Sequence, residues 1–438
     1  MLNTQTNIFL FIGAWIIIPL ILDIIFNLYS ALSILIKRKK EDIKLEYYPY
    51  ISIVVPVYNT SRSLGNCIDS IIGQNYPLDK IELLLVDNGS TDNSHDVFIE
   101  KQSTSKIRMW WLESKNGRGI ALNKGVYLSN GKYIFNIDSD GILHKDAILN
   151  CVIKLENSPE TIALTGSVLT NYKQIKETKG FFKKLLQKFE LFEYGESFLI
   201  GRAFQSQTNS IFNIAGAFSV FRKETILKTQ LYNKDTIGED AHMTSQIRKF
   251  IKGKIELCSS AYIFVEPIDD FDTLYKQRQR WQIGEIEVAS LFREKKGNKK
   301  GFNILKTALL KDHTLLFPRL IWVFATIYLI FSSYPIQIFI IANIILYSLY
   351  MLMSFMNFFI IKLFLKETDE LKSFLNKNFF ISILMPFYRS LTFGIRAIGI
   401  LNSYENSTSW NRKSLSDEFK EIKNYIFRKN KGKTNEST

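Results

Sequence analysis

The sequence predicts an α/β fold with a mainly parallel sheet, flanked by transmembrane and interfacial helices. Two observations lead to this fold class. Between about residues 50 and 300, short β-branched segments alternate with segments whose apolar residues recur at helical spacing. Such alternation is typical of parallel strands joined by helices. On both sides of this region lie apolar stretches of about 20 residues or more, which is long enough to cross a bilayer.

The first apolar segment, residues 7–36, is predicted to be a transmembrane helix. It has no basic residue before the apolar run and no small-residue cleavage site, which favours a retained anchor over a signal peptide. Asp23 and Asn27 interrupt it, and we expect their side chains to face protein or water because polar groups are costly in lipid. The basic run KRKK at residues 37–40 follows, so this end of the helix is expected in the cytoplasm.

The central region opens with buried strands that end in polar residues. Strands are predicted in the segments ISIVVPVYN, IELLLVD, IRMWWLES and GKYIFNIDSD, which begin at Ile51, Ile81, Ile107 and Gly131. Helical spacing is found between them in SLGNCIDSIIGQNY and RGIALNKGVYLS. Ligands of parallel sheets bind at the carboxyl ends of the strands. Asp87, Asp138 and Asp140 follow such ends, so these carboxylates are candidates for one site.

The chain is predicted to return to the membrane after residue 300. We predict an interfacial amphipathic helix at residues 301–313 and spanning segments at about 314–332 and about 336–365. A basic cytoplasmic tail is predicted at residues 402–438. The segment 379–401 is long enough to span, but Arg389 and Arg396 would each cost about 2.5–3.5 kcal/mol at mid-bilayer. A fourth crossing would also leave the basic tail outside. A re-entrant or interfacial segment is therefore favoured over a spanning one.

The formal net charge of +14 indicates anionic partners. Nucleic acid is not predicted as a partner, because neither an arginine-rich helix nor a base-stacking motif is found. Contact of Lys and Arg with anionic membrane lipid and anionic substrates is favoured instead. Residues 181–202 mix Phe and Leu with Lys, and they fit equally well an interfacial helix or an amphipathic helix packed on the core. Cys67, Cys151 and Cys258 are far apart, which predicts neither a metal site nor a disulfide framework.

The segment NIDSDG, residues 136–141, holds the most informative pair of acids. In an extended chain, side chains two residues apart point to the same side, so Asp138 and Asp140 can share one target. The alternative is a polar turn after a strand. Three further clusters follow along the chain, namely NIAGAFSVFRKE, TIGEDAH and YKQRQRWQIG. Each is common on a solvated surface by itself, but their joint occurrence between membrane segments favours a functional site.

With these motifs the sequence resembles the membrane-embedded, inverting family 2 glycosyltransferases, and among them the cellulose, hyaluronan and poly-N-acetylglucosamine synthases. The resemblance runs from about Ile51 to Gly284 and rests on VVPVYN, LVDNGSTD, GRGIALNKG, DSD, GED and QRQRW. It implies a GT-A nucleotide-sugar-binding domain at residues 50–300, on the cytoplasmic side of a multi-pass cell membrane protein. It also implies a UDP-sugar donor and Mg²⁺ or Mn²⁺ as cofactor.

The resemblance assigns roles to individual residues. Asp138 and Asp140 are similar to the family's D-x-D and would hold the metal, with Asp138 also contacting the donor. Asp240 matches the base that deprotonates the acceptor hydroxyl, a role suited to a carboxylate. Arg280 would stabilise the departing diphosphate. Donor contacts are further expected from Tyr58, Asn59, Asp87, Arg118 and Gln277, and acceptor contacts from Gly216, Glu239 and Trp281.

Residue chemistry supports the metal independently. A donor diphosphate beside several carboxylates would be repelled, and crowded carboxylates have raised pKa values. A divalent cation resolves both problems, since Mg²⁺ is normally held by one or two carboxylates plus substrate phosphates. This sequence departs from the family pattern at Asn88, where a second Asp is common, and at Arg118, where Lys is common. His242 is a rival base, although a lone His on a helix is more often structural.

Three functions are compatible with these residues. The first is a processive polysaccharide synthase whose membrane helices pass the chain outward. With so few helices, a channel would need an accessory or export subunit or a second copy of the chain. The second is a glycosyltransferase that adds one sugar to a membrane lipid. The third is a catalytically silent protein that binds nucleotide sugars. No G-x-G-x-x-G follows the first strand, which disfavours a dehydrogenase. The residues do not select the sugar, and UDP-N-acetylglucosamine or UDP-glucose is expected from the resemblance.

Overall fold

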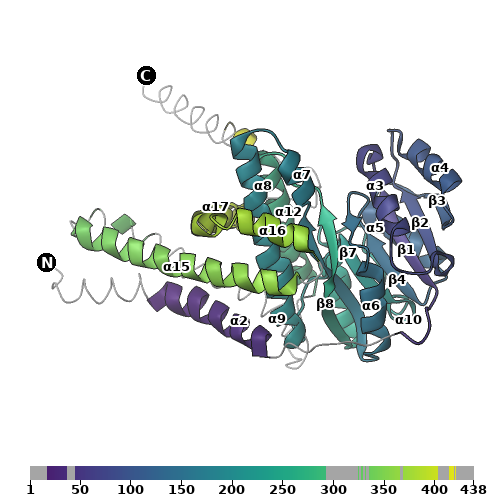
Figure 1. The fold of residues 1–438 in the computed structure, drawn as a ribbon, viewed down its shortest axis with the longest axis horizontal. Helices are drawn as coiled ribbons and strands as arrows, with labels where there is room; N and C mark the ends of the chain where they lie inside the picture. Colours follow the sequence, from purple (N-terminus) through teal and green to yellow (C-terminus); the bar gives the residue numbers. More distant parts are fainter. Residues whose placement is uncertain are drawn as a thin grey trace, which may run out of the picture.

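The computed structural model describes residues 17–36, 45–292, 335–365, 368–402 and 414–418, together with a few isolated residues. Its centre is an eight-stranded mixed sheet in the order β3-β2-β1-β4-β7-β6-β8-β5 (Figure 1). The strands are β1 Ile51–Val57, β2 Ile81–Asp87, β3 Arg108–Glu113, β4 Tyr133–Ile137, β5 Ile142–Leu143, β6 Thr161–Thr170, β7 Phe218–Arg222 and β8 Lys254–Val265. The predicted α/β class is confirmed.

The four strands predicted from the sequence form one half of the sheet. β1 pairs in parallel with β2 and β4, and β2 pairs in parallel with β3. All seven residues of β1 are buried, because the helices α3 (Ser61–Ile72) and α5 (Arg118–Leu128) return the chain over the sheet. In α3 the buried residues are Ser63, Leu64, Cys67, Ile68 and Ile71. The last four are the apolar residues at helical spacing in the predicted segment SLGNCIDSIIGQNY. Parallel pairing with buried strands explains the continuous apolar runs.

The other half of the sheet was not predicted. β7 is antiparallel to both β4 and β6, and β5 is antiparallel to β8. β6 and β8 are parallel but contain register shifts, and their Ser- and Thr-rich sequences lack a clear apolar period. The remaining helices around the sheet are α4 Ser94–Thr104, α6 Ala147–Glu156, α7 Tyr172–Glu177, α8 Phe181–Tyr194, α9 Arg202–Gln207, α10 Lys223–Ile226, α11 Glu239–Gln246 and α12 Phe271–Leu291.

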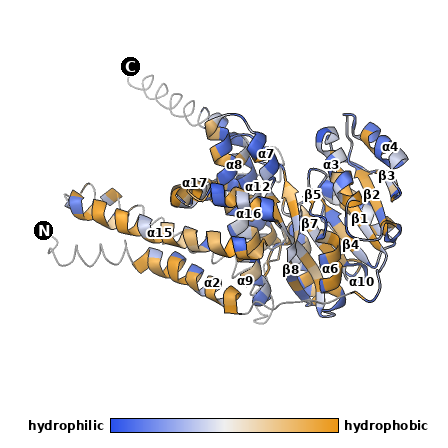
Figure 2. Ribbon diagram, in the orientation of Figure 1, coloured by the Kyte–Doolittle hydropathy of each residue, from blue (hydrophilic) through white to orange (hydrophobic). Residues whose placement is uncertain are grey.

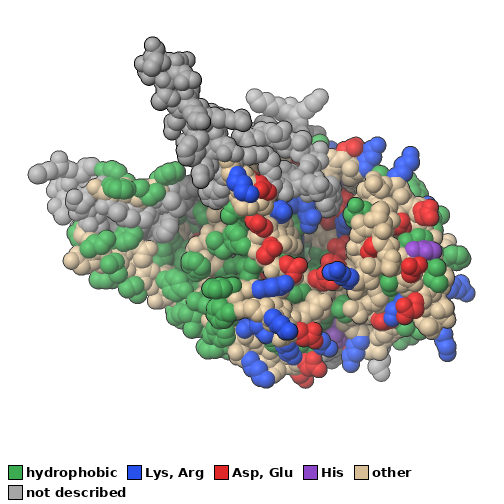
Figure 3. Space-filling view, turned by 90° about the horizontal axis from the view of Figure 1, so that it is seen from above, with side chains coloured by type: hydrophobic (Ala, Val, Ile, Leu, Met, Phe, Trp, Pro, Cys, Tyr) green, Lys and Arg blue, Asp and Glu red, His purple; other side chains and the backbone are tan. Residues whose placement is uncertain are grey.

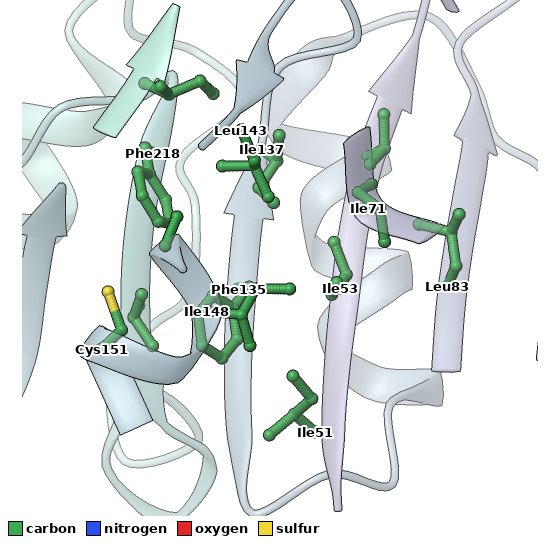
Figure 4. Packing of buried hydrophobic residues seen from close by; sticks show 14 of the residues in the cluster. Ile51, Ile53, Ile71, Leu83, Phe135, Ile137, Leu143, Ile148, Cys151 and Phe218 are labelled. Carbon is green, nitrogen blue, oxygen red and sulfur yellow. The ribbon is translucent and has the colours of Figure 1, made fainter. Parts of the chain in front are cut away.

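The main core lies between the sheet and the helices α3 and α6. Ile51 and Ile53 of β1 lie on the same face of the sheet as Phe135 of β4 and Phe218 of β7, and Ile148 of α6 belongs to the same cluster (Figure 4). The Phe135 and Phe218 rings are stacked with their centroids 6.5 Å apart. This packing fixes β4, the strand whose carboxyl end carries Asp138 and Asp140.

Two apolar helices project together from the sheet domain. α2 (Phe26–Ile36), which continues a π-helical turn at Leu20–Ile25, runs beside α15 (Ile336–Phe364) (Figure 1). Both are hydrophobic along their length (Figure 2), and hydrophobic side chains gather over them while charged ones cover the sheet domain (Figure 3). Among the described residues, α15 alone is long and apolar enough to cross a membrane. It coincides with the predicted span at 336–365.

The segment predicted to be re-entrant or interfacial forms the helix α17, Ile381–Asn402, after the short helix α16, Asp369–Lys377. α17 packs against α8, α12 and α15. Its two arginines have protein partners, since Arg389 forms an ion pair with Glu196 and Arg396 donates to the Gln282 side chain at 3.0 Å. Packing on helices of the sheet domain favours the re-entrant or interfacial placement, which stays a prediction.

The ambiguous stretch 181–202 is α8 and the π-helical turn that follows it, with the first residue of α9 at its end. Phe189, Leu191 and Phe192 are buried in the hydrophobic cluster shared with α15 and α17, as the core-packed alternative predicts. Only the first turn exposes apolar side chains. Residues 7–16, the predicted helix at 301–313, and most of 314–332 and of the tail 402–438 lie outside the described residues.

Gly131 provides a test of the sheet packing. A Cβ atom there would lie 2.3 Å from the Ser52 backbone nitrogen and 2.5 Å from the Ile51 carbonyl carbon, and backbone atoms cannot give way cheaply. We expect Gly131→Ala to lower the free energy of unfolding by about 2–3 kcal/mol, as overpacking does. Thermal unfolding of the detergent-solubilised chain measures it. Gly394→Ala, which enters open space on α17, is the control and should leave stability unchanged or raise it by up to about 1 kcal/mol. Equal stability of both variants would contradict this close approach.

Candidate active site

A large cavity of about 2640 Å³ opens at the carboxyl ends of β1 and β4 and extends between α12, α15 and α17. Most of the site residues predicted from the sequence line it, namely Tyr58, Asn59, Arg118, Asp138, Asp140, Gly216, Glu239, Asp240, Gln277, Arg280 and Trp281. Asp87 is not among the described residues that line it. One cavity therefore brings together residues that are as far as 223 positions apart in the sequence, from Tyr58 to Trp281.

The two acids of the DSD motif follow β4 directly. β4 ends at Ile137, and the Gly141 N–H donates to the Asp138 carbonyl at 3.0 Å, which closes a turn. A Cβ atom on Gly141 would lie 2.4 Å from Ile263 Cδ1, so a larger residue would have to displace the Ile263 side chain where this turn packs on β8. The turn leaves both Asp138 and Asp140 on the cavity wall, as their position after a parallel strand predicts.

Arg118 joins three acids from two separate segments. It is the first residue of α5 and follows Gly117, whose φ of 134° is in the region that favours glycine. Its Nη2 lies 2.7 Å from Asp138 Oδ1, and its Nη1 contacts the Glu239 carboxylate and lies 3.5 Å from Asp240 Oδ1. The guanidinium is thus the shared positive charge between the end of β4 and the start of α11.

Glu239 and Asp240 are the first two residues of α11, where acidic side chains are favoured by the helix dipole. Glu239 is 4% exposed, so its contact with Arg118 is buried. Asp240 remains accessible from the cavity because Gly216 stands beside it. A Cβ atom on Gly216 would lie 2.1 Å from Asp240 Oδ2. Gly216 also accepts a hydrogen bond from Arg118 through its carbonyl, at 3.0 Å.

The pKa values report a site with an excess of negative charge. Burial raises the pKa of Asp240 to about 7, and Arg118 opposes this while Glu239 and Asp138 add to it. Burial, Asp138 and Glu266 raise the pKa of Asp140 to about 7. The described residues contain no group of three or more His, Cys, Asp or Glu that could hold a metal. Two acids suit a cation such as Mg²⁺, which takes its other ligands from phosphate and water.

The QRQRW motif lies on α12, from which Gln277, Arg280 and Trp281 line the cavity. Burial lowers the pKa of Arg280. The negative charges of Asp138 and Glu239 oppose this effect, and the positive charge of Arg118 adds to it, so the Arg280 guanidinium is close to these groups. The Trp281 indole is 36% exposed and lines the cavity. An exposed aromatic face in a polar cavity can receive the apolar face of a sugar.

The loops after β1 and β2 form the remaining rim. The Asn59 side chain accepts from the Thr91 N–H at 2.8 Å, which joins the two loops. Asp87 instead accepts from the Ser90 N–H at 3.0 Å and stabilises its own turn. Asn88 accepts from the Gly117 N–H and so holds the loop before Arg118. The donor contact predicted for Asp87 stays a prediction.

The sequence reasoning missed several cavity residues. Asp92 lines the rim, and hydrogen bonds to Ser94 and Ser61 lower its pKa to about 2 despite an opposing effect of burial. Tyr194 and Phe198 lie beside Trp281, but they belong to a segment that was read only as an amphipathic helix. His242 bonds Gln246 and packs on Phe292, and it is not among the described residues that line the cavity. This position favours the structural role.

Residues 52–228 match the model of the family described as Glycosyl transferase family 2. This part of the chain is thus similar to family 2 glycosyltransferases. The match includes Arg118, Asp138, Asp140 and Gly216 but ends before the GED and QRQRW motifs. The resemblance inferred from the sequence motifs is thereby confirmed.

Similar proteins from staphylococci cover more of the chain. It is 25% identical over 293 residues to the poly-beta-1,6-N-acetyl-D-glucosamine synthase of Staphylococcus aureus (strain COL), which is 66% of each protein. It is 26% identical over 313 residues to the synthase of the same name from Staphylococcus epidermidis, covering 70% of this chain and 69% of that one. The chain thus spans just under two thirds of the length of the S. aureus relative.

A solved structure agrees with the fold. The mannosyltransferase PcManGT from Pyrobaculum calidifontis, in complex with GDP-Man and Mn²⁺, aligns with a TM-score of 0.57 and 17% identity. The alignment covers 87% of this chain and 98% of that chain. The predicted GT-A type of α/β fold is confirmed by this likeness together with the mixed sheet.

Removing Arg118 tests the electrostatics of the cluster without a substrate. In Arg118→Met the acids lose their shared cation, and we expect the free energy of unfolding to fall by roughly 3 kcal/mol at about pH 8. The folded-state pKa of Asp240, already about 7 and above the roughly 3.9 of an unfolded Asp, should rise further. Protonation then relieves the repulsion, so the loss of stability should be smaller at about pH 5. Urea unfolding with chelator present at both pH values measures this.

The control for this prediction is Lys101→Met, which removes a cation from an ion pair with the half-exposed Asp69. It should change stability by less than about 1 kcal/mol at either pH. A loss in Arg118→Met that is independent of pH would contradict the assignment of Arg118 as the counter-charge of the acids.

Proposed function

We propose that this chain is a metal-dependent, inverting glycosyltransferase. It moves a sugar from a nucleoside-diphosphate sugar, expected to be a UDP-sugar, to a growing polysaccharide at the cytoplasmic face of the cell membrane. The observation that carries the proposal is that one cavity is lined by Asp138 and Asp140 together with Asp240, Arg280 and Trp281. Similarity to staphylococcal synthases named for poly-beta-1,6-N-acetyl-D-glucosamine supports a hexosyl or N-acetylhexosaminyl donor.

The donor half of the reaction belongs to the end of β4. Asp138 and Asp140 would hold Mg²⁺ or Mn²⁺, which would supply positive charge to the donor diphosphate. The raised pKa of Asp140 fits this role, because a carboxylate without a counter-charge there is unfavourable until a cation arrives. Arg280 stabilises the diphosphate as the bond to the anomeric carbon breaks. Tyr58, Asn59, Asp87 and Gln277 are proposed to surround the rest of the donor.

The acceptor half belongs to α11 and α12. Asp240 takes the proton of the acceptor hydroxyl while the oxygen attacks the anomeric carbon from the face opposite the diphosphate, which inverts the configuration. A pKa of about 7 suits a base that works near neutral pH. Trp281 supports the acceptor sugar, and Gly216 keeps the space in front of Asp240 open. Glu239 acts through Arg118, since the two side chains are paired.

The volume of the cavity, about 2640 Å³, favours a polymer over a single sugar as product. Beyond the acids it is lined by Asn343, Tyr347 and Asn357 of α15 and by Arg389 and Arg396 of α17. These polar side chains stand among apolar ones such as Phe26, Leu346 and Met353, and we propose that they contact a growing chain that leaves toward the membrane. The second candidate, addition of one sugar to a membrane lipid, would use the same opening for the lipid. Export subunits or a second copy would complete a channel for the polymer.

Product analysis separates these candidates. The full chain in lipid nanodiscs, given Mn²⁺ and a panel of radiolabelled nucleotide sugars, should produce long polymer from one of them. One lipid-linked sugar would support the second candidate, and no product with any donor would contradict both.

Asp240→Asn tests the base. We expect transfer to fall by roughly 10²–10⁴-fold, because the amide cannot accept the hydroxyl proton. Donor binding, measured by equilibrium dialysis of the nucleotide sugar, should stay within about threefold of wild type, since the donor acids are untouched. Asp235→Asn, at an exposed position of the preceding loop, is the matched control and should retain full activity. Undiminished transfer in Asp240→Asn would exclude this residue as the base.

The pH profile gives a second test of Asp240. A base must be deprotonated to act, so kcat/KM should fall as the pH drops through the raised pKa of about 7. Measurements between about pH 5 and pH 9 at constant ionic strength and saturating Mn²⁺ would show this limb. A kcat/KM that stays constant down to about pH 5 would mean that Asp240 titrates normally or takes no proton.

A further inference from the structure

The QRQRW helix contains a buried ion pair that the proposed reaction leaves unexplained. Arg278 of α12 is 3% exposed. Its Nη2 lies 2.5 Å from Glu193 Oε2 of α8, and its Nε lies 3.3 Å from Glu193 Oε1. Both carboxylate oxygens are therefore engaged by one guanidinium. A buried ion pair is often no more stabilising than a well-packed apolar pair, so its presence beside the cavity suggests a role in the site.

The guanidinium lies against the indole of the proposed acceptor platform. Arg278 and Trp281 are three residues apart on α12 and share a helix face. The guanidinium carbon Cζ lies over the Trp281 ring, 4.4 Å from its centroid, and 5.5 Å from the Tyr194 centroid. A cation in this position is attracted to the ring face. Arg278 thus covers one face of the indole, while 36% of the Trp281 residue stays exposed and lines the cavity.

Two further rings contact the same indole. The Phe198 ring is perpendicular to Trp281 with centroids 6.1 Å apart, and the Tyr194 centroid is 6.2 Å away. Tyr194, Phe198 and Trp281 all line the cavity. Arg278 contacts the Trp281 and Tyr194 rings and is itself held by the Glu193 carboxylate. The Arg278–Glu193 pair therefore anchors this group of rings.

The anchor continues into α17. The Tyr388 hydroxyl donates to Glu193 Oε2 at 2.8 Å, and the Tyr388 ring stacks on Phe189 of α8 with centroids 4.9 Å apart. A chain of direct contacts therefore runs from Tyr388 through Glu193 and Arg278 to Trp281. It connects the helix expected at the membrane surface to the acceptor side of the cavity.

We propose that Arg278 is a positioning residue, anchored by Glu193 and Tyr388, that fixes the Trp281 indole as the stacking platform for the acceptor sugar. The inference rests on the proposed glycosyl transfer for the identity of the ligand. It adds that the platform is oriented from outside the reacting centre, through a buried charge pair and a hydroxyl of α17.

The test uses a variant that removes the anchor without leaving a buried charge. Arg278→Met alone would strand the Glu193 carboxylate, so Arg278→Met/Glu193→Gln is used, in which the pair is neutral and of similar volume. In nanodiscs we expect KM for short N-acetylglucosamine oligosaccharides to rise roughly tenfold, the loss expected for a misoriented aromatic contact. KM for the nucleotide sugar and the rate of its hydrolysis by water should stay within about twofold.

A spectroscopic readout follows Trp281 without turnover. The near-ultraviolet circular dichroism that Trp281 contributes is the difference between wild type and Trp281→Phe. We expect this contribution to disappear in the double variant, because the indole loses its fixed orientation. Tyr388→Phe removes only the hydroxyl and serves as a milder variant. It should raise the acceptor KM and reduce the Trp281 circular dichroism, each by less than in the double variant. Lys254→Met/Glu256→Gln, which removes an ion pair away from the cavity, is the matched control and should change neither.

The outcomes are distinct. A double variant and a Tyr388→Phe variant with wild-type acceptor KM and an unchanged Trp281 signal would overturn the proposal. If the double variant does not fold, Tyr388→Phe decides alone by the same two readouts. Failure of the proposed function would look different, since the wild-type chain would then hydrolyse or transfer none of the nucleotide sugars tested, while the Trp281 signal would still report whether Arg278 orients the indole.

Discussion

The site depends on one electrostatic constraint, which is that several carboxylates are held together in a buried place with a single guanidinium between them. Arg118 contacts Asp138, Glu239 and Asp240, which come from the end of β4 and the start of α11. Even with the nearby Arg280 counted, two positive charges do not balance the four acids Asp138, Asp140, Glu239 and Asp240. The remaining negative charge favours a divalent cation and explains why burial can raise the pKa of Asp240 into the range of a base.

The second half of the site is built from helices that also contact the membrane segments. α12 carries Arg280 and Trp281 and packs against α17, which in turn packs against α15. The proposed nucleotide-sugar side is thus fixed by the sheet, whereas the proposed acceptor side is fixed by helices that pack on the apolar helix α15 through α17. This division matches a reaction in which a soluble donor meets an acceptor that remains at the membrane.

The sequence predicts the parallel half of the sheet and most of the site because both have strong local signals. Buried parallel strands produce continuous apolar runs, and their ends mark Asp138 and Asp140 directly. The strands β5 to β8, which include antiparallel pairs, have no such signal, since β5 has two residues and β6 has a shifted register. The position of Arg118 between the acids, and of Arg278 behind Trp281, arises only from tertiary packing. The role of the GED motif was assigned only from the family resemblance, because acidic residues in this pattern are common at the start of any helix.

The most direct test of this account is a structure of the full chain in lipid nanodiscs with a nucleoside diphosphate and Mn²⁺, determined by cryo-electron microscopy. The account predicts density for the ion at Asp138 and Asp140, with the diphosphate between it and Arg280, and with the Asp240 carboxylate facing the open space beside Trp281. Density for the ion and the diphosphate outside this cavity, or a diphosphate bound without contact to either Asp138 or Asp140, would contradict it.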